Sequence, residues 1–271
     1  YINGPDSDVF HKGGVLYGYS DAVPAARETG QVILVEGYFD HARVAAGGFP
    51  AVVATCGTAL TEVQARILRV MAEDTVVCYD GDQAGVRAAV KAAMTILAAG
   101  GYPRIARLPE GMDPDDHIAA RGMDAFMDLV ERARGPVGFC LDLLEGGFPR
   151  GVAGVRTAKR LMEIVASGSD PLVREQLLLE VEEASGFSRA ALESHLKQNE
   201  RRDGRPGSRD ASGGSDDALI AALVAGGALD CGLIRWLEPD DFRSEAGKNL
   251  FPALREQVEE GCVTVNFGLL S

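Results

Sequence analysis

The feature that most constrains the fold of this chain is a regular alternation of short apolar runs and helical segments between residues 31 and 120. The runs QVILVEG, FPAVVATCGTA and DTVVCYD are rich in valine, isoleucine and other residues of buried strands, and RIARL is a fourth such run. Stretches with helical spacing separate them. Strands that alternate with helices predict a parallel sheet covered by helices.

The pattern changes after about residue 120, where strand signals stop and helical spacing continues. We therefore predict an α/β fold with a parallel sheet and flanking helices, followed by an all-α helical subdomain and a further partial helical domain. A charged stretch rich in glycine and serine separates the last two, as is typical of a flexible linker. The predicted divisions are 1–29, 30–120 (the α/β domain), 121–198 (helical), 199–215 (linker) and 216–271 (partial helical).

The net charge of −13 argues against strong nucleic-acid binding by this chain alone, because the dominant phosphate term requires lysine and arginine. A site for divalent cations must itself be acidic, however, so acidity does not exclude a phosphate substrate. The five cysteines are scattered without a C-x-x-C pair, which predicts neither a zinc ribbon nor a disulfide framework. Without a signal peptide or a long apolar run, a cytoplasmic protein with no membrane association is predicted.

Carboxylates follow three of the predicted strands, where ligands of open α/β sheets bind. Glu36 follows VILV, and the pair Asp80 and Asp82 follows TVVCY. Asp113 and Asp115 follow the RIARL run. Carboxylate oxygens are the ligands that Mg²⁺ prefers, and a bound cation would offset the repulsion within the Asp-Gly-Asp pair. The sequence thus predicts a metal site at one sheet edge.

Each of these signals taken alone also has a simpler structural interpretation. Asp-Gly-Asp after a strand is often a turn or a helix cap, and Glu36 could be a cap. Asp113 before a proline is typical of a helix start. Gly57 in CGT would allow a tight turn. The order of the signals, and their shared position at one edge of the sheet, favour the metal site.

Three stretches together resemble the toprim domain of bacterial DnaG-type primases: VILVEGYFDHARVAAGGFPAVVATCGTALT, VVCYDGDQAGVRAA and LPEGMDPDD. The upstream YINGPDSDVFHKGGVLYGYSDA is similar to the segment that leads into that domain in these primases. Residues 121–198 resemble their helical subdomain, and 216–271 resemble the start of their helicase-binding domain. The resemblance therefore implies a primase fragment that contains the toprim part of the catalytic core and the start of the helicase-binding domain.

The resemblance also implies a function and roles for individual residues. DnaG-type primases are nucleotidyltransferases that copy single-stranded DNA into short RNA primers from ribonucleoside triphosphates, with Mg²⁺ or Mn²⁺. The residues matched to catalysis are Glu36, Asp80, Asp82 and Lys12; those matched to metal binding are Glu36, Asp80, Asp82, Asp113 and Asp115; those matched to nucleotide or nucleic-acid binding are Asn3, Lys12, Asp40, Gly57 and Thr58.

Further expectations concern partners and activity. The resemblance implies a single-stranded DNA template, a replicative helicase bound through the C-terminal region, a monomer, and location at the bacterial replication fork. Zinc is expected only in an N-terminal domain outside the matched segment. Because the basic N-terminal half of the polymerase core is not in the sequence, we expect little or no primer synthesis by this chain alone. The alternatives are a toprim-type nuclease or topoisomerase fragment and a helicase-docking module without activity of its own.

Overall fold

The computed structural model describes residues 12–55, 57–144 and 146–202. After a short 3₁₀ turn, η1 (Lys12–Gly14), the chain forms one compact unit from Leu16 onward. The predicted linker beyond residue 202 and the predicted helical domain 216–271 lie outside the described residues. Within the described part, every helix is too short or too polar for a bilayer crossing.

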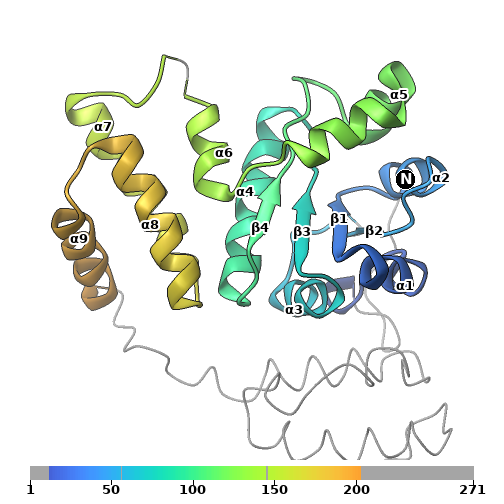
Figure 1. Cartoon of the computed structure of the whole chain (residues 1–271), viewed down its shortest axis with the longest axis horizontal. Helices are drawn as coiled ribbons and strands as arrows, with labels where there is room; N and C mark the ends of the chain where they lie inside the picture. Colours follow the sequence, from blue (N-terminus) through green and yellow to red (C-terminus); the bar gives the residue numbers. More distant parts are fainter. Residues whose placement is uncertain (1–11, 56, 145, 203–271) are drawn as a thin grey trace, which may run out of the picture. The chain divides into compact units, whose positions relative to one another are not determined.

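Four strands form the predicted parallel sheet, in the order β2-β1-β3-β4 (Figure 1). In the central pairs, Leu34 lies opposite Val53 on one side and Val77 on the other. Because every pairing is parallel, all four carboxyl ends meet at one edge of the sheet. The strands are β1 (Gln31–Val35), β2 (Val52–Ala54), β3 (Asp74–Val77) and β4 (Pro103–Ile105).

Helices pack against both faces of this sheet, as the alternation predicted. Helices α1, α3 and α4 form one layer, because α1 and α4 contact strands and α3 packs against both of them. Helices α2 and α5 pack together in a second layer, in which α2 contacts β2. Their bounds are α1 (Tyr19–Thr29), α2 (Tyr38–Ala46), α3 (Glu62–Met71), α4 (Gln83–Ala98) and α5 (Pro114–Glu131).

The strands are apolar on both faces, which explains why their sequences read as continuous runs rather than as alternating patterns. Alternate residues of each strand, such as Ile33 and Val35, face the layer of α2 and α5. There they pack against Val44 of α2 and against Phe126 and Val130 of α5, all fully buried. Burial of both sheet faces fixes the strand register and therefore the position of the residues at the strand ends.

The predicted helical region forms four further helices, which Figure 1 shows on the β4 side of the sheet. The core of these helices is continuous with the α/β part through Leu97 of α4, which belongs to the same buried cluster as apolar residues of α6, α7 and α8. Asp170 accepts hydrogen bonds from two amides of α8 and Pro171 opens that helix, as the sequence indicated. The helices are α6 (Pro136–Asp142), α7 (Gly151–Ser167), α8 (Pro171–Ser185) and α9 (Arg189–Arg202).

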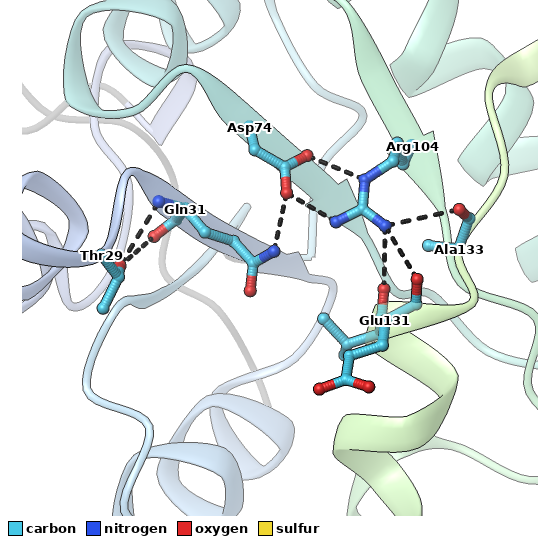
Figure 2. Close-up of polar contacts among 7 residues, drawn as sticks. Thr29, Gln31, Asp74, Arg104, Glu131 and Ala133 are labelled. Atoms are coloured by element: carbon cyan, nitrogen blue, oxygen red, sulfur yellow. Dashed lines mark hydrogen bonds and ion pairs between the residues drawn. The ribbon is translucent and has the colours of Figure 1, made fainter.

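Arg104 of β4 connects the sheet to the end of α5 (Figure 2). Its guanidinium donates two hydrogen bonds to the carboxylate of Asp74, at 2.9 and 2.5 Å, and Gln31 donates a third at 2.6 Å. The same guanidinium donates to the main-chain carbonyls of Val130, Glu131 and Ala133. These carbonyls lie at or just after the last turn of α5, where carbonyls have few or no helical partners; the Val130 carbonyl also accepts from the Ala133 amide at 3.2 Å. Arg104 thereby fixes α5, whose other end carries Asp113.

We expect Arg104→Met to lower the free energy of unfolding by about 2 kcal/mol, because it removes two of the three side-chain hydrogen bonds to Asp74 and the guanidinium donor of three carbonyls. Burial raises the pKa of Asp74, but the hydrogen bonds from Arg104 and Gln31 together with the Arg104 charge outweigh it and lower the pKa below its usual value. The difference in free energy of unfolding between wild type and Arg104→Met should therefore be largest at neutral pH. It should shrink as the pH falls below about 4, where Asp74 becomes protonated. Urea unfolding at several pH values measures this.

The matched control is Arg107→Met, because Arg107 is exposed and donates one hydrogen bond, to the carbonyl of Asp142. This change should alter the free energy of unfolding by less than about 0.5 kcal/mol. Equal effects of the two substitutions, or a difference between wild type and Arg104→Met that does not depend on pH, would contradict the role given to Arg104.

Candidate functional site

Glu36 and Asp80 lie at the carboxyl ends of two adjacent strands. Glu36 directly follows β1, and the pairing of β1 with β3 continues through the hydrogen bond from the Cys78 amide to the Leu34 carbonyl, at 2.8 Å. Strand β1 lies between β2 and β3. The chain therefore goes from β1 to β2 on one side and then forms β3 on the opposite side of β1. Such switch points are where open α/β sheets bind ligands.

The carboxylates of Glu36 and Asp80 are half-buried. Among the described residues, none donates a hydrogen bond or forms an ion pair with either side chain. Burial raises the pKa of both groups above their usual values, and the neighbouring Asp82 raises both further. The charge of Asp80 also raises the pKa of Glu36. Half-buried anions that repel each other are costly unless a cation compensates them.

Asp82 and Asp113 cap helices, so the simpler structural interpretation of these residues is also correct. Asp82 accepts a hydrogen bond from the Gly85 amide at 2.7 Å and begins α4. Asp113 accepts one from the Asp116 amide at 2.6 Å and begins α5. Both nevertheless belong to the same acidic group, because the charge of each raises the pKa of Asp80. Capping holds these two carboxylates at the sheet edge.

Two glycines allow the Asp80–Asp82 turn to pack closely against its surroundings. A Cβ atom on Gly81 would lie 2.1 Å from the carbonyl oxygen of Pro109, and one on Gly85 would lie 2.3 Å from that of Asp80. The Gly81 amide donates to the carbonyl of Met112 at 2.8 Å. The turn that carries Asp80 is therefore joined directly to the loop that leads to Asp113.

Asp40 joins the starts of α2 and α5. Its carboxylate is 6% exposed and accepts hydrogen bonds from the amides of Gly37, at 3.1 Å, and Asp115, at 3.3 Å. Burial raises its pKa to about 6, against the lowering effect of these hydrogen bonds. The side chain thus holds the turn after Glu36 against the start of α5. Its predicted contact with nucleotide or nucleic acid stays a prediction.

Arg43 is a contributor to this region that the sequence analysis did not identify. It lies one turn after Asp40 on α2, and its side chain forms an ion pair with the carboxylate of Asp115. Helix α2 therefore contacts Asp115 twice: Asp40 accepts from the Asp115 amide, and Arg43 pairs with the Asp115 carboxylate. The carboxylate of Asp115 is directed to Arg43, in contrast to Glu36 and Asp80. The sequence showed only that Arg43 lies one helical turn after Asp40, which places both on one side of α2 but does not indicate Asp115 as the partner.

The remaining predicted residues lie elsewhere or outside the described part. Gly57 and Thr58 follow β2, where Gly57 adopts a positive φ of 71° and the Thr58 hydroxyl donates to the Thr55 carbonyl at 2.9 Å. They form the predicted turn. Lys12 begins η1, but its side chain is outside the description, as is the whole of Asn3. The roles predicted for these four residues stay predictions.

The donor set fits a hard divalent cation in its chemistry, because all of the grouped side chains are carboxylates. Within residues 12–202 with their gaps, however, no three acidic, histidine or cysteine side chains are gathered closely enough to hold a metal ion. Asp82 and Asp113 each use one oxygen for capping. Glu36 and Asp80 are free to turn toward a cation.

Comparison with known proteins gives a consistent family of relatives. Residues 33–118 match the family model described as Toprim-like. The DNA primase of Geobacillus stearothermophilus is 35% identical over 209 residues, which are 76% of this chain and 35% of that protein. The chain thus spans about a third of the length of this relative.

Solved structures agree with this comparison. The zinc-binding and RNA polymerase domains of the Aquifex aeolicus primase superpose with a TM-score of 0.63 and 32% identity, over 73% of this chain and 47% of that one. A DnaG primase catalytic domain bound to single-stranded DNA gives a TM-score of 0.59 and 30% identity, over 69% of this chain and 61% of that one. The predicted fold class is confirmed for the described residues.

Proposed function

This chain belongs to the bacterial DnaG-type DNA primases and carries their toprim domain, and on that premise we propose that it supplies the nucleotidyl-transfer site of a DNA primase. The reaction joins ribonucleotides into a short primer on a single-stranded DNA template. The observation that carries the proposal is the pair Glu36 and Asp80, half-buried at adjacent strand ends and, among residues 12–202 as described, without a hydrogen-bond or ion-pair partner. A nucleotidyl transferase needs such a cation site beside its reacting phosphate.

The carboxylates have separate tasks in this proposal. Glu36 and Asp80 are the first ligands of Mg²⁺ or Mn²⁺, since no protein group competes for them among the described residues. Asp82 and Asp113 can each offer the oxygen not used in capping. When bound, the cation lowers the pKa of an attacking hydroxyl and neutralises charge on the phosphates. Asp115 is paired with Arg43, so of the five predicted metal ligands we expect it to contribute least to holding the cation.

The primase reaction is favoured over a toprim nuclease or topoisomerase because the similarity to a named DNA primase extends over 209 residues, beyond the 33–118 match. A template of single-stranded DNA is supported by the relative whose catalytic domain was solved with that ligand. Ribonucleoside triphosphates and a replicative helicase remain expectations from the family. The helicase contact was assigned to 216–271, which lies outside the described residues.

A chimeric primase tests this function. Residues 16–202 would replace the matching segment of the Geobacillus stearothermophilus primase, and template-dependent RNA synthesis would be measured with Mg²⁺ and radiolabelled ribonucleotides. We expect primers from the chimera and little or no product from the present chain alone. A folded chimera that makes no RNA, or that cleaves the template instead, would contradict the proposal.

A further inference from the structure

One face of α7 concentrates unpaired positive charge in an otherwise acidic protein. Residues 146–162 contain four arginine or lysine residues and no aspartate or glutamate, and α7 (Gly151–Ser167) has a single acidic residue, Glu163, against three basic ones. The whole chain has 40 acidic against 27 basic residues. All four cations are exposed. In the described part of the chain, none of them forms an ion pair or a side-chain hydrogen bond. They are Arg150, Arg156, Lys159 and Arg160.

The helix holds these cations on one side because its other side is committed to the core. Leu161, Met162 and Val165 are buried against residues of α8 and α9. Lys159 and Arg160 follow Arg156 by three and four residues, so all three side chains belong to neighbouring turns on one exposed side of α7. Figure 1 shows α7 among the helices on the β4 side, while α2 lies on the other side. The surface is therefore separate from Glu36 and its neighbours.

Two exposed valines lie on the same surface. Val152 is 71% exposed and precedes Arg156 by one turn, and Val155 is 41% exposed and precedes Lys159 by one turn. The outer surface of a nucleic-acid duplex offers phosphates to such a helix but few apolar groups. A single strand offers its phosphates together with the apolar faces of unpaired bases. The combination of cations and valines thus fits a single strand better than a duplex.

We propose that this surface of α7 binds the phosphate backbone of single-stranded DNA. This proposal deepens the proposed function, on which it rests for the identity of the strand as the primase template. Each phosphate neutralised on a single strand contributes about 0.7 to the slope of log affinity against log salt concentration. Arg150 and the three cations of α7 can therefore supply much of the attraction for DNA, against the repulsion from the net negative charge of the chain.

The test measures binding of the full chain to a fluorescent 20-nucleotide single strand by anisotropy, at several salt concentrations, with EDTA and without nucleotides. Arg156→Gln/Arg160→Gln is compared with Arg121→Gln/Arg132→Gln, which changes two exposed arginines, one near the middle of α5 and one at its C-terminal cap. Both variants lose the same charge. For the α7 variant we expect about tenfold weaker binding at low salt and a salt slope lower by about 1.4. The control should stay within twofold of wild type.

Three outcomes would overturn the proposal. Equal losses in both variants would mean that only net charge matters. If a duplex of the same sequence bound as tightly as the single strand, and lost as much affinity in the α7 variant, the surface would have no preference for a single strand. Unchanged DNA binding, with loss of poly-glutamate binding in the α7 variant alone, would assign the surface to an acidic protein. Because metal and nucleotides are left out, a negative result here leaves primer synthesis by the chimera as a separate test.

Discussion

Replacing Asp80 and Asp82 together by asparagine is expected to reduce primer synthesis by the chimeric primase at least about 10³-fold. The substitution removes two negative charges at the carboxyl end of β3, and with them the main attraction for a cation. Asparagine is nearly isosteric and is itself a good N-cap, so α4 should still begin at residue 82. Initial rates at saturating template and ribonucleotides measure the effect.

The loss should not come from unfolding. Burial and mutual repulsion raise the pKa of Asp80, which means that its charge opposes folding at neutral pH in the metal-free protein. The double variant should therefore unfold at the same temperature as wild type or a higher one. The control is Asp124→Asn/Asp128→Asn, an exposed acidic pair on α5 with the same charge change. If this control lost as much activity, the effect could not be assigned to the strand-end carboxylates.

Gly81→Ala is expected to reduce primer synthesis at least about 10²-fold and to lower the free energy of unfolding by about 2 to 3 kcal/mol. The new Cβ would lie 2.1 Å from the carbonyl oxygen of Pro109 and 2.9 Å from its carbon. These are main-chain atoms, so either the Asp80–Asp82 turn or the loop before Asp113 must move. Rates measured well below the unfolding temperature separate displacement of the site from loss of the fold.

Gly146→Ala provides the comparison for that experiment. Gly146 has a positive φ of 81°, and a Cβ there would meet no atom within 4 Å. Its substitution should therefore cost only the backbone strain, about 1 kcal/mol, and leave activity unchanged. A Gly81→Ala protein that is as stable and as active as wild type would show that the contact with Pro109 does not fix the site.

The strands and the residues at their ends could be predicted because both depend on local patterns. VILV and TVVC are almost entirely apolar and alternate with helices, which is typical of a parallel sheet, and such a sheet brings Glu36 and Asp80 to one edge. Periodicity does not determine strand order, so the adjacency of β1 and β3 appears only in the structure. Likewise, the sequence indicated either a cap or a ligand for Asp82 and Asp113, and the geometry lets one carboxylate serve both.

Contacts between segments distant in the sequence could not be predicted. The ion pair of Arg43 with Asp115 joins α2 to α5 across 72 positions, and neither residue belongs to a pattern that indicates the other. The same holds for Gly81 and Pro109, which are neighbours only because β4 pairs with β3. Asp40 was predicted from the resemblance to primases, yet only the folded structure reveals that both of its oxygens accept main-chain hydrogen bonds.

The most direct test of the central claim, that the strand-end carboxylates form one cation site, is a calorimetric titration of this chain with Mn²⁺ at pH 7. Wild type and Asp124→Asn/Asp128→Asn are expected to bind with the same saturable heat, and Asp80→Asn/Asp82→Asn is expected to show none. Equal binding curves for all three proteins would contradict the claim. Asp80 and Asp82 would then be only the two ends of a turn and the cap of α4.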